Sequence, residues 1–164
     1  MSHYQKIKNK IIEADQLDSL IAQWKKDNET IVFTNGCFDI IHQGHVDYLA
    51  KAADKGSKLI IGVNTDRSVN RIKGSNRPIQ DEYSRMMILA AMQFVDAVIL
   101  FDEETPINLI NQVIPSILVK GSDYKPEDIV GYETVVGNGG YVETIDFLPG
   151  FSTSSIEKKI QNSK

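Results

Sequence analysis

The chain has 164 residues, 41% of them hydrophobic and 24% charged, which is enough to bury one domain's core without disulfides or a structural metal. Its formal net charge of -4 excludes a broad basic surface for nucleic acid or an anionic membrane, so an anionic ligand needs a local cluster of cations. Cys37 is the single cysteine, and the sequence shows neither a signal peptide nor a membrane-spanning apolar run. We therefore expect one domain, residues 1–164, in a reducing cytoplasm.

The first predicted element is an amphipathic helix that packs on the rest of the chain. Its apolar residues recur at helical spacing after Asp15, namely Leu17, Leu20, Ile21 and Trp24. We expect residues 1–30 to form a helical extension and residues 31–160 to form the core of the domain.

Five short apolar runs follow this extension. Most of them are too continuous to be strands with one solvated face, and such runs are typical of parallel strands buried on both faces. They are residues 31–34, 59–63, 97–101, 117–119 and 141–145.

Helical patterns lie between most of these runs, so the chain alternates between strand and helix. That alternation predicts an α/β fold with a doubly wound sheet. The expected helices are residues 46–53, closed by Gly56; residues 86–94; residues 107–113, with Thr105 as cap and Pro106 in the first turn; and a last helix from near Ser154, which has capping-box spacing to Glu157.

The segment of residues 34–45 joins the first strand to the next helix. Backbone N–H groups and the positive helix end there point into the crevice above the sheet, where α/β folds bind phosphate. Gly36 removes a side chain where a nucleotide must approach, and Gly44 lets the chain turn so that His42 and His45 face one ligand. Two imidazoles beside a polyphosphate are donors that spread its charge.

Other interpretations of this segment stay open. His42 and His45 could bind a metal, with Asp39 as the only further ligand nearby, or could be solvated residues at a helix start. Cys37 could act as a nucleophile, although a small buried thiol is the more usual role. The glycines and the strand-loop-helix context favour phosphate binding.

Cations gather between the second strand and the next helix, in what we interpret as a loop: Arg67, Arg71, Lys73 and Arg77. A loop of this kind suits an anionic substrate, while a solvated basic surface is the alternative and is favoured for Arg67. Arg85 lies one turn into the following helix, where an ion pair with Asp81 is a structural alternative.

Two later segments occupy positions in the predicted fold that are comparable to that of residues 34–45. Residues 120–124 follow the fourth strand as residues 34–45 follow the first, although an ordinary strand-end turn is the alternative. Residues 152–155 precede the last helix and offer hydroxyl groups at a helix N-terminus, where capping alone would explain one of them.

The segment of residues 34–45 resembles the H-x-G-H signature of the cytidylyltransferase-like nucleotidyltransferase superfamily. The similarity runs from about Ile31 to Ile160 and points to the heptose 1-phosphate adenylyltransferase branch. Ser154 replaces a usual Thr, and residues 148–151 lack the Arg-Thr-Glu-Gly lead-in of glycerol-3-phosphate cytidylyltransferases, which favours the sugar branch. The other matching segments are residues 62–66, 73–78, 85, 95–96, 119–127, 138–140 and 152–154.

The resemblance implies a single-domain Rossmann-like fold whose five parallel strands have the order 3-2-1-4-5, with the N-terminal helix packed on it. That order brings the loops after the first and fourth strands over one crevice. It also implies transfer of AMP from ATP, with Mg²⁺, to a sugar 1-phosphate such as heptose 1-phosphate, giving an ADP-sugar and pyrophosphate for lipopolysaccharide precursors. The alternatives are a glycerol-3-phosphate-type cytidylyltransferase and a nucleotide-binding module without turnover. A P-loop and a G-x-G-x-x-G fingerprint are both absent from the sequence.

By resemblance, the site residues fall into three groups, and no protein ligand to a metal is expected. The catalytic group is His42, His45, Lys73 and Lys120. The nucleotide-binding group is Thr34, Asn35, Gly36, Cys37, Phe38, Asp39, His42, His45, Lys120, Gly121, Asp123, Ser152, Thr153 and Ser154. The substrate-binding group is Asn64, Asp66, Arg71, Lys73, Arg77 and Arg85.

The expected partners follow from the same resemblance. They are ATP and a sugar 1-phosphate, whereas the expected absence of nucleic acid and membrane partners follows from the net charge and the lack of a membrane-spanning run. A separate sugar kinase would supply the 1-phosphate, and residues 124–136 are a candidate homodimer interface.

Overall fold

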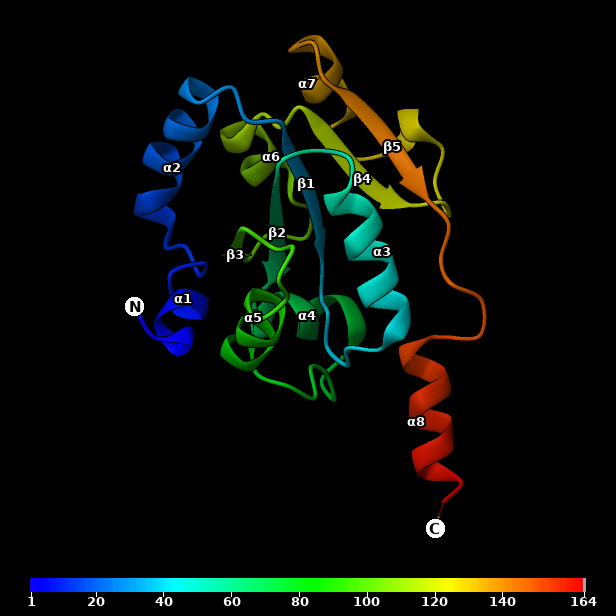
Figure 1. Cartoon of the computed structure of the whole chain (residues 1–164). Coiled ribbons are helices and arrows are strands. Elements are labelled where there is room, and N and C mark those ends of the chain that lie inside the picture. The colour runs from blue at the N-terminus through cyan, green and yellow to red at the C-terminus, as the bar shows by residue number, and fades with distance from the viewer. Residues whose placement is uncertain (164) are drawn as a thin grey trace.

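The computed structural model describes residues 1–163 and contains one five-stranded sheet, in which the paired strands run parallel (Figure 1). The strand order is β3-β2-β1-β4-β5, so the predicted fold class and strand order are confirmed. Each strand includes the predicted apolar run, and three of them extend beyond it. The strands are β1 (Ile31–Gly36), β2 (Lys58–Asn64), β3 (Ala97–Phe101), β4 (Ile117–Gly121) and β5 (Tyr141–Ile145).

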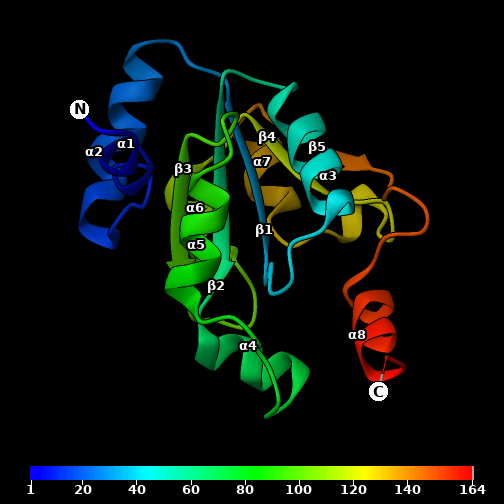
Figure 2. The ribbon, with the colours of Figure 1, turned by 60° about the horizontal axis from the view of Figure 1, so that its bottom comes forward.

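Helices cover both faces of this sheet (Figures 1 and 2). The described α-helices are α1 (His3–Lys8), α2 (Ala14–Lys26), α3 (Gln43–Ala53), α4 (Asp66–Lys73), α5 (Glu82–Ala90), α6 (Ile107–Val113), α7 (Tyr132–Gly137) and α8 (Thr153–Gln161), and a 3-10 helix spans Pro126–Asp128.

Two hydrophobic cores follow from the alternation of side chains along the central strands. Val32 and Leu59 pack with residues of α3 and α5 on one face. Ile31 and Phe33 pack with residues of α2, α6 and α7 on the other face. Because both faces are buried, the strands are apolar almost throughout, which explains why their runs are continuous.

The N-terminal segment also protects an edge of the sheet. Ile11 forms an isolated parallel bridge with Val98 of β3, and Ile12 donates its backbone N–H to the Val98 carbonyl at 2.9 Å. The extension therefore satisfies backbone groups that would otherwise be open on an edge strand.

Several predicted helix boundaries are wrong. Residues 66–73, interpreted as loop, form α4, whose first turn is capped by the Thr65 hydroxyl. Helix α5 starts at Glu82 and ends at Ala90 instead of spanning residues 86–94, because Asp81 caps it by accepting a hydrogen bond from the Ser84 N–H. Pro106, and not Thr105, is the residue that precedes α6.

Helix α8 is capped by Ser152, two residues before the predicted Ser154. The Ser152 hydroxyl accepts a hydrogen bond from the Ser155 N–H at 3.1 Å, so Ser154 lies inside the helix. Glu157 forms an ion pair with Arg77 and does not complete a capping box. The helix has no buried residue and projects away from the sheet (Figure 2). Across residues 1–163, no helix combines the length and apolarity needed to cross a bilayer.

Candidate active site

The loop between β1 and α3 forms the floor of the candidate site. Phe38 adopts a left-handed backbone with φ of 49° and is buried, with its ring edge against His45 at a centroid distance of 5.5 Å. A Cβ atom on Gly36 would lie 3.0 Å from the Phe38 ring, so glycine permits this close packing. The loop is thereby folded back beneath the histidines of α3.

His42 and His45 stack on each other at the start of α3. Their ring centroids are 3.9 Å apart, and a Cβ on Gly44 would lie only 3.0 Å from the His42 ring. The Nδ1 atoms of both rings are buried and have no hydrogen-bond partner within residues 1–163. Burial lowers the pKa of both rings, and the neighbouring His42 and Lys73 help to lower the pKa of His45 to about 4. Without a ligand, His45 is therefore neutral at pH 7.

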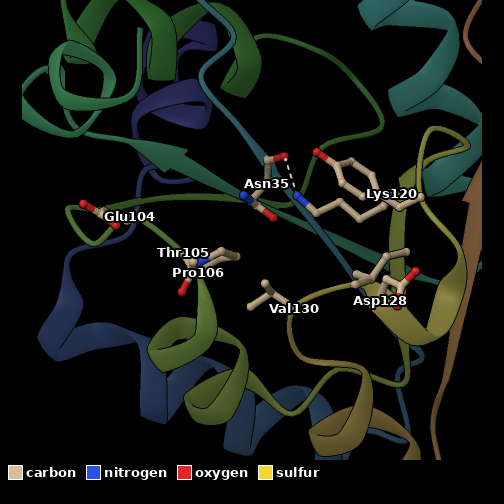
Figure 3. Close-up of a pocket in the computed structure, with 9 residues that line it drawn as sticks. Asn35, Glu104, Thr105, Pro106, Lys120, Asp128 and Val130 are labelled. Carbon is tan, nitrogen blue, oxygen red and sulfur yellow. Dashed lines mark hydrogen bonds between the residues drawn. The ribbon is translucent and has the colours of Figure 1, made fainter. Parts of the chain in front are cut away.

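Lys120 brings a cation to the same place from the end of β4. Its Nζ lies 3.5 Å from the backbone carbonyl oxygen of Asn35, at the end of β1 (Figure 3). Burial lowers the pKa of Lys120 to about 8. The Oδ1 atom of Asn35 is also buried without a described partner. Since unpaired buried polar groups are costly, these atoms indicate a position where a polar ligand binds.

A cavity of about 220 Å³ lies between these groups, and an adjoining depression reaches Ser152. Of the predicted nucleotide-binding and catalytic residues, the following line the cavity: Asn35, Gly36, Cys37, Phe38, Asp39, His45, Lys73, Lys120, Gly121 and Thr153. His42 and Ser152 line the adjoining depression. The folded chain therefore brings together most of the nucleotide set, including residues separated by more than a hundred positions.

Three members of the nucleotide set, Thr34, Asp123 and Ser154, lie outside the cavity and the depression, and Cys37 lines the cavity without a reactive thiol. The Thr34 hydroxyl is fully buried and hydrogen-bonds to the Tyr48 hydroxyl at 2.8 Å. Asp123 and Ser154 are exposed and do not belong to the lining of the cavity. Cys37 places its thiol 3.7 Å from Asn64 Oδ1, and burial raises its pKa, so the geometry favours packing over a nucleophilic role.

Asp39 supports the loop from below. Its carboxylate is 1% exposed and accepts hydrogen bonds from the backbone N–H groups of Ile79 and Gln80 and from the Arg77 guanidinium. Burial alone would raise the pKa of Asp39, but these hydrogen bonds bring it below its usual value. Both carboxylate oxygens of Asp39 thus accept hydrogen bonds from within the protein, so neither is free to bind a metal.

Arg85 is the largest fully buried side chain of the described chain. Its guanidinium donates to the carbonyl oxygens of Cys37 at 2.6 Å and Asn64 at 2.7 Å, and to the Asp66 carboxylate at 2.8 Å. The alternative ion pair with Asp81 is wrong, because Asp81 caps α5. In this arrangement Arg85 holds the ends of β1 and β2 together and has no donor exposed to a substrate.

The remaining members of the predicted substrate set are also engaged. Asn64 donates to the Ser68 hydroxyl at 2.9 Å, and Arg71 bonds to the Asp102 carbonyl and carboxylate. Arg77 is shared between Asp39 and Glu157. Of the six residues, Lys73 alone lines the cavity beside the histidines.

Three aromatic residues that line this cavity, Tyr48, Tyr124 and Phe147, were not among the predicted site residues. Tyr48 donates to the Val119 carbonyl at 3.1 Å, and burial raises its pKa to about 12. Its position three residues after His45, on the inner face of α3, was the available signal. Phe147 lies over Gly121, where an added Cβ would be 2.1 Å from its ring.

The cavity is cationic, and its chemistry does not suit a resident metal. Within residues 1–163 there is no cluster of three or more His, Cys, Asp or Glu side chains able to hold a metal ion. The one carboxylate near the histidines, Asp39, is occupied as described.

Comparisons with known proteins agree with this geometry. Residues 33–159 match the profile of the Cytidylyltransferase-like family. The protein named Bifunctional protein HldE from Rhodopseudomonas palustris (strain HaA2) is 50% identical over 152 residues, covering 92% of this chain and 31% of the relative. Its namesake from Actinobacillus pleuropneumoniae serotype 5b (strain L20) is 51% identical over 154 residues, covering 94% of this chain and 32% of the relative. The chain thus spans about a third of the length of the curated relatives it matches.

Two solved structures are also similar. The lipopolysaccharide core biosynthesis protein from Thermoplasma volcanium GSS1 aligns with a TM-score of 0.60 and 30% identity, covering 73% of this chain and 97% of that one. The pantoate-beta-alanine ligase from Francisella tularensis aligns with a TM-score of 0.61 and 14% identity, covering 92% of this chain and 76% of that one. The second likeness concerns the fold alone.

Proposed function

Since this chain belongs to the cytidylyltransferase-like family and is a nucleotidyltransferase, we propose that it transfers AMP from ATP to a sugar 1-phosphate. The products are an ADP-sugar and pyrophosphate, and the proposed sugar is heptose 1-phosphate for lipopolysaccharide precursors. The names of two relatives, HldE and a lipopolysaccharide core biosynthesis protein, support this choice of pathway.

The observation that carries the proposal is the arrangement of His45 and Lys120 around one cavity, with His42 stacked on His45 in the adjoining depression. Two neutral imidazoles with unsatisfied buried nitrogens and one desolvated ammonium form a set of donors aimed at a single place. Such a set is suited to a triphosphate, because its charge-bearing oxygens complete the missing hydrogen bonds.

The proposed reaction is an in-line displacement at the α-phosphorus of ATP. A phosphate oxygen of the sugar 1-phosphate forms a bond to the α-phosphorus while the bond to the oxygen bridging the α- and β-phosphates breaks. The electron pair leaves with pyrophosphate, and magnesium enters and leaves as part of the phosphate substrates. No group of the protein becomes covalently attached, so catalysis consists of positioning and of stabilising charge.

The side chains have distinct parts in this step. We assign His42 and His45 to donate to the oxygens that gain charge as pyrophosphate departs. Lys120, beside the Asn35 carbonyl, would contact the α-phosphate between the ends of β1 and β4, and Lys73, which lines the same cavity, would add a second positive charge. Thr153, at the start of α8, would donate its hydroxyl or backbone N–H to the same phosphates.

The proposal extends to the partners of this chain. The curated relatives are about three times as long and are named bifunctional. We propose that a sugar kinase supplies the 1-phosphate, that the assignment of residues 1–164 to one domain holds, and that residues 124–136 serve a homodimer.

Pyrophosphate release with paired substrates tests the proposal. The expected result is turnover with ATP and heptose 1-phosphate, with much weaker turnover when CTP replaces ATP or glycerol 3-phosphate replaces the sugar. Preference for CTP and glycerol 3-phosphate would identify a cytidylyltransferase instead. Binding of ATP without turnover of any phosphate acceptor would contradict the proposal and favour a module without activity.

A further inference from the structure

The sugar of the proposed acceptor lacks a binding place among the residues predicted for it. Arg85 is fully buried and Arg77 mostly buried, and both are held by internal partners; Arg71 is exposed but paired with Asp102, and none of the three offers an acceptor to a polyol. Lys73 can contact a phosphate but cannot distinguish sugar hydroxyl groups, because it offers only donors of one kind on a flexible chain. The hydroxyl groups must therefore be recognised elsewhere.

A second cavity lies on the other side of Lys120, bordered by the loop after β3 and the segment after β4 (Figure 3). Its volume is about 230 Å³. Asn35, Lys120 and Tyr124 line this cavity and also line the one beside the histidines, so the same three side chains separate the two spaces. A molecule in the second cavity can therefore contact one that occupies the first.

The lining of the second cavity differs in chemistry from that of the first. It contains the carboxylates of Glu104 and Asp128 and the hydroxyl of Thr105, which surround an apolar surface that includes Pro106 and Val130 (Figure 3). Neither carboxylate takes part in a side-chain hydrogen bond or an ion pair within the described residues. The buried Asn35 Oδ1, which also lacks a partner, lies at the border with Lys120.

This combination suits a polyhydroxylated molecule better than a nucleotide. Carboxylates accept hydrogen bonds from two neighbouring hydroxyl groups, and the apolar surface can lie against the C–H face of a sugar ring. Two carboxylates would repel a triphosphate.

In-line geometry places the two substrates on opposite sides of the α-phosphorus. The histidines and Thr153, which we assign to the departing pyrophosphate, lie on the α8 side of Lys120. The attacking phosphate must then approach from the other side, where the second cavity opens next to Asn35 and Lys120. The sugar that follows this phosphate enters the second cavity.

We propose that Glu104, Thr105 and Asp128 form the subsite that binds the hydroxyl groups of the acceptor sugar, with Asn35 and Lys120 holding its phosphate at the border. This inference rests on the proposed function, and it assigns the specificity of the enzyme for the acceptor sugar to residues after β3 and β4. The residues between β2 and α5 then support the site but do not contact the sugar.

Steady-state kinetics of pyrophosphate release test the subsite with E104A and D128A, and with E127A as the matched control. Glu127 is also exposed and adjoins Asp128, but it does not line the second cavity. Loss of a charged hydrogen-bond partner should raise the KM for heptose 1-phosphate about tenfold or more in E104A and D128A. The KM for ATP should stay unchanged, and E127A should behave as the unmodified protein does.

A third variant, V130W, fills the cavity without removing a charge. It should also raise the KM for the sugar phosphate and leave the KM for ATP unchanged. Unchanged sugar KM values in all three variants overturn the subsite while leaving the proposed function intact. A KM for ATP that rises with the sugar KM also overturns it, because the cavity would then hold the nucleotide. Absence of turnover with any sugar phosphate in the unmodified protein overturns both proposals.

Discussion

Arg77 and Asp39 form an ion pair with 2.5 Å between the guanidinium and a carboxylate that is 1% exposed. Asp39 belongs to the loop after β1, and Arg77 to the turn between α4 and α5. The pair therefore fastens the turn after α4 to the underside of the loop that carries the candidate phosphate site. Arg77 also contacts Glu157, so α8 is attached at the same point.

We expect R77A to destabilise the fold more than E157A does. Removing Arg77 leaves a buried carboxylate with only its backbone donors, whereas removing Glu157 leaves Arg77 still paired. Urea unfolding of R77A, D39N and the double variant should give a coupling free energy of about 1 to 3 kcal/mol. Additive effects of the two substitutions would show that the pair does not stabilise the loop.

The ion pair between Arg77 and Asp39 also predicts that the unfolding free energy decreases at acidic pH. Hydrogen bonds lower the pKa of Asp39 in the folded state below its value in the unfolded state. The stabilising contribution of the Asp39 carboxylate is therefore fully present above the unfolded-state pKa and is lost as the pH falls through the folded-state pKa. The unfolding free energy of the unmodified protein should therefore fall more steeply than that of D39N below about pH 4. Parallel acid profiles for the two proteins would contradict this assignment.

We expect R85K to lower the unfolding free energy by about 2 to 4 kcal/mol, because one lysine ammonium cannot replace the planar guanidinium, which donates to four acceptors from several nitrogens. The carbonyl groups of Cys37 and Asn64 would then lose partners in the interior. R67K is the control, since Arg67 is exposed and pairs with Asp102 at the surface. Equal urea midpoints for R85K and R67K would rule out the buried network as a source of stability.

We expect H45A to lower turnover by about a hundredfold or more and to weaken ATP binding much less. His45 is assigned to the charge that develops on the leaving group, so its contact should strengthen in the transition state and its effect should be larger in kcat than in ground-state affinity. Pyrophosphate release and calorimetric titration with ATP measure the two quantities, and H3A, at an exposed N-terminal histidine, is the control. Near-native turnover in H45A would remove His45 from the reaction.

We expect K120M to stabilise the fold and to abolish most of the activity. The pKa of Lys120 is lowered to about 8 by burial, so the charged form destabilises the folded state at neutral pH. Methionine of similar shape should raise the unfolding free energy at pH 7 by about 1 to 3 kcal/mol. A variant that is less stable than the unmodified protein would show that the ammonium is well solvated.

The pH profile of the unmodified protein should reveal the same group. The folded state binds fewer protons than the unfolded state between about pH 8 and the unfolded value of 10.5, so its stability should rise with pH across that window. In contrast, kcat/KM for ATP should fall above about pH 8 as Lys120 loses its charge. In K120M, both changes should disappear, which calorimetry and kinetics can check.

Much of the fold followed from local sequence patterns. The five apolar runs predicted all five strands, and the glycines and histidines of residues 34–45 predicted a strand-loop-helix phosphate site. The boundaries of α5 and α8 were wrong because several polar residues near each start could act as caps. Only the folded backbone determines that Asp81 and Ser152 do so.

The candidate site was likewise predicted from the sequence only in part. Residue types and their order along the chain were sufficient to indicate His42, His45, Lys120 and the hydroxyls before α8, because each follows or precedes an element at the carboxyl edge of the sheet. A sequence cannot tell which cations point at a ligand and which are held by internal partners. That distinction depends on contacts between residues far apart in the chain, such as Arg85 with Cys37 and Arg77 with Glu157. Tertiary structure alone therefore made Arg77 and Arg85 part of the support, and it alone placed Glu104 and Asp128 around the same cavity as Lys120.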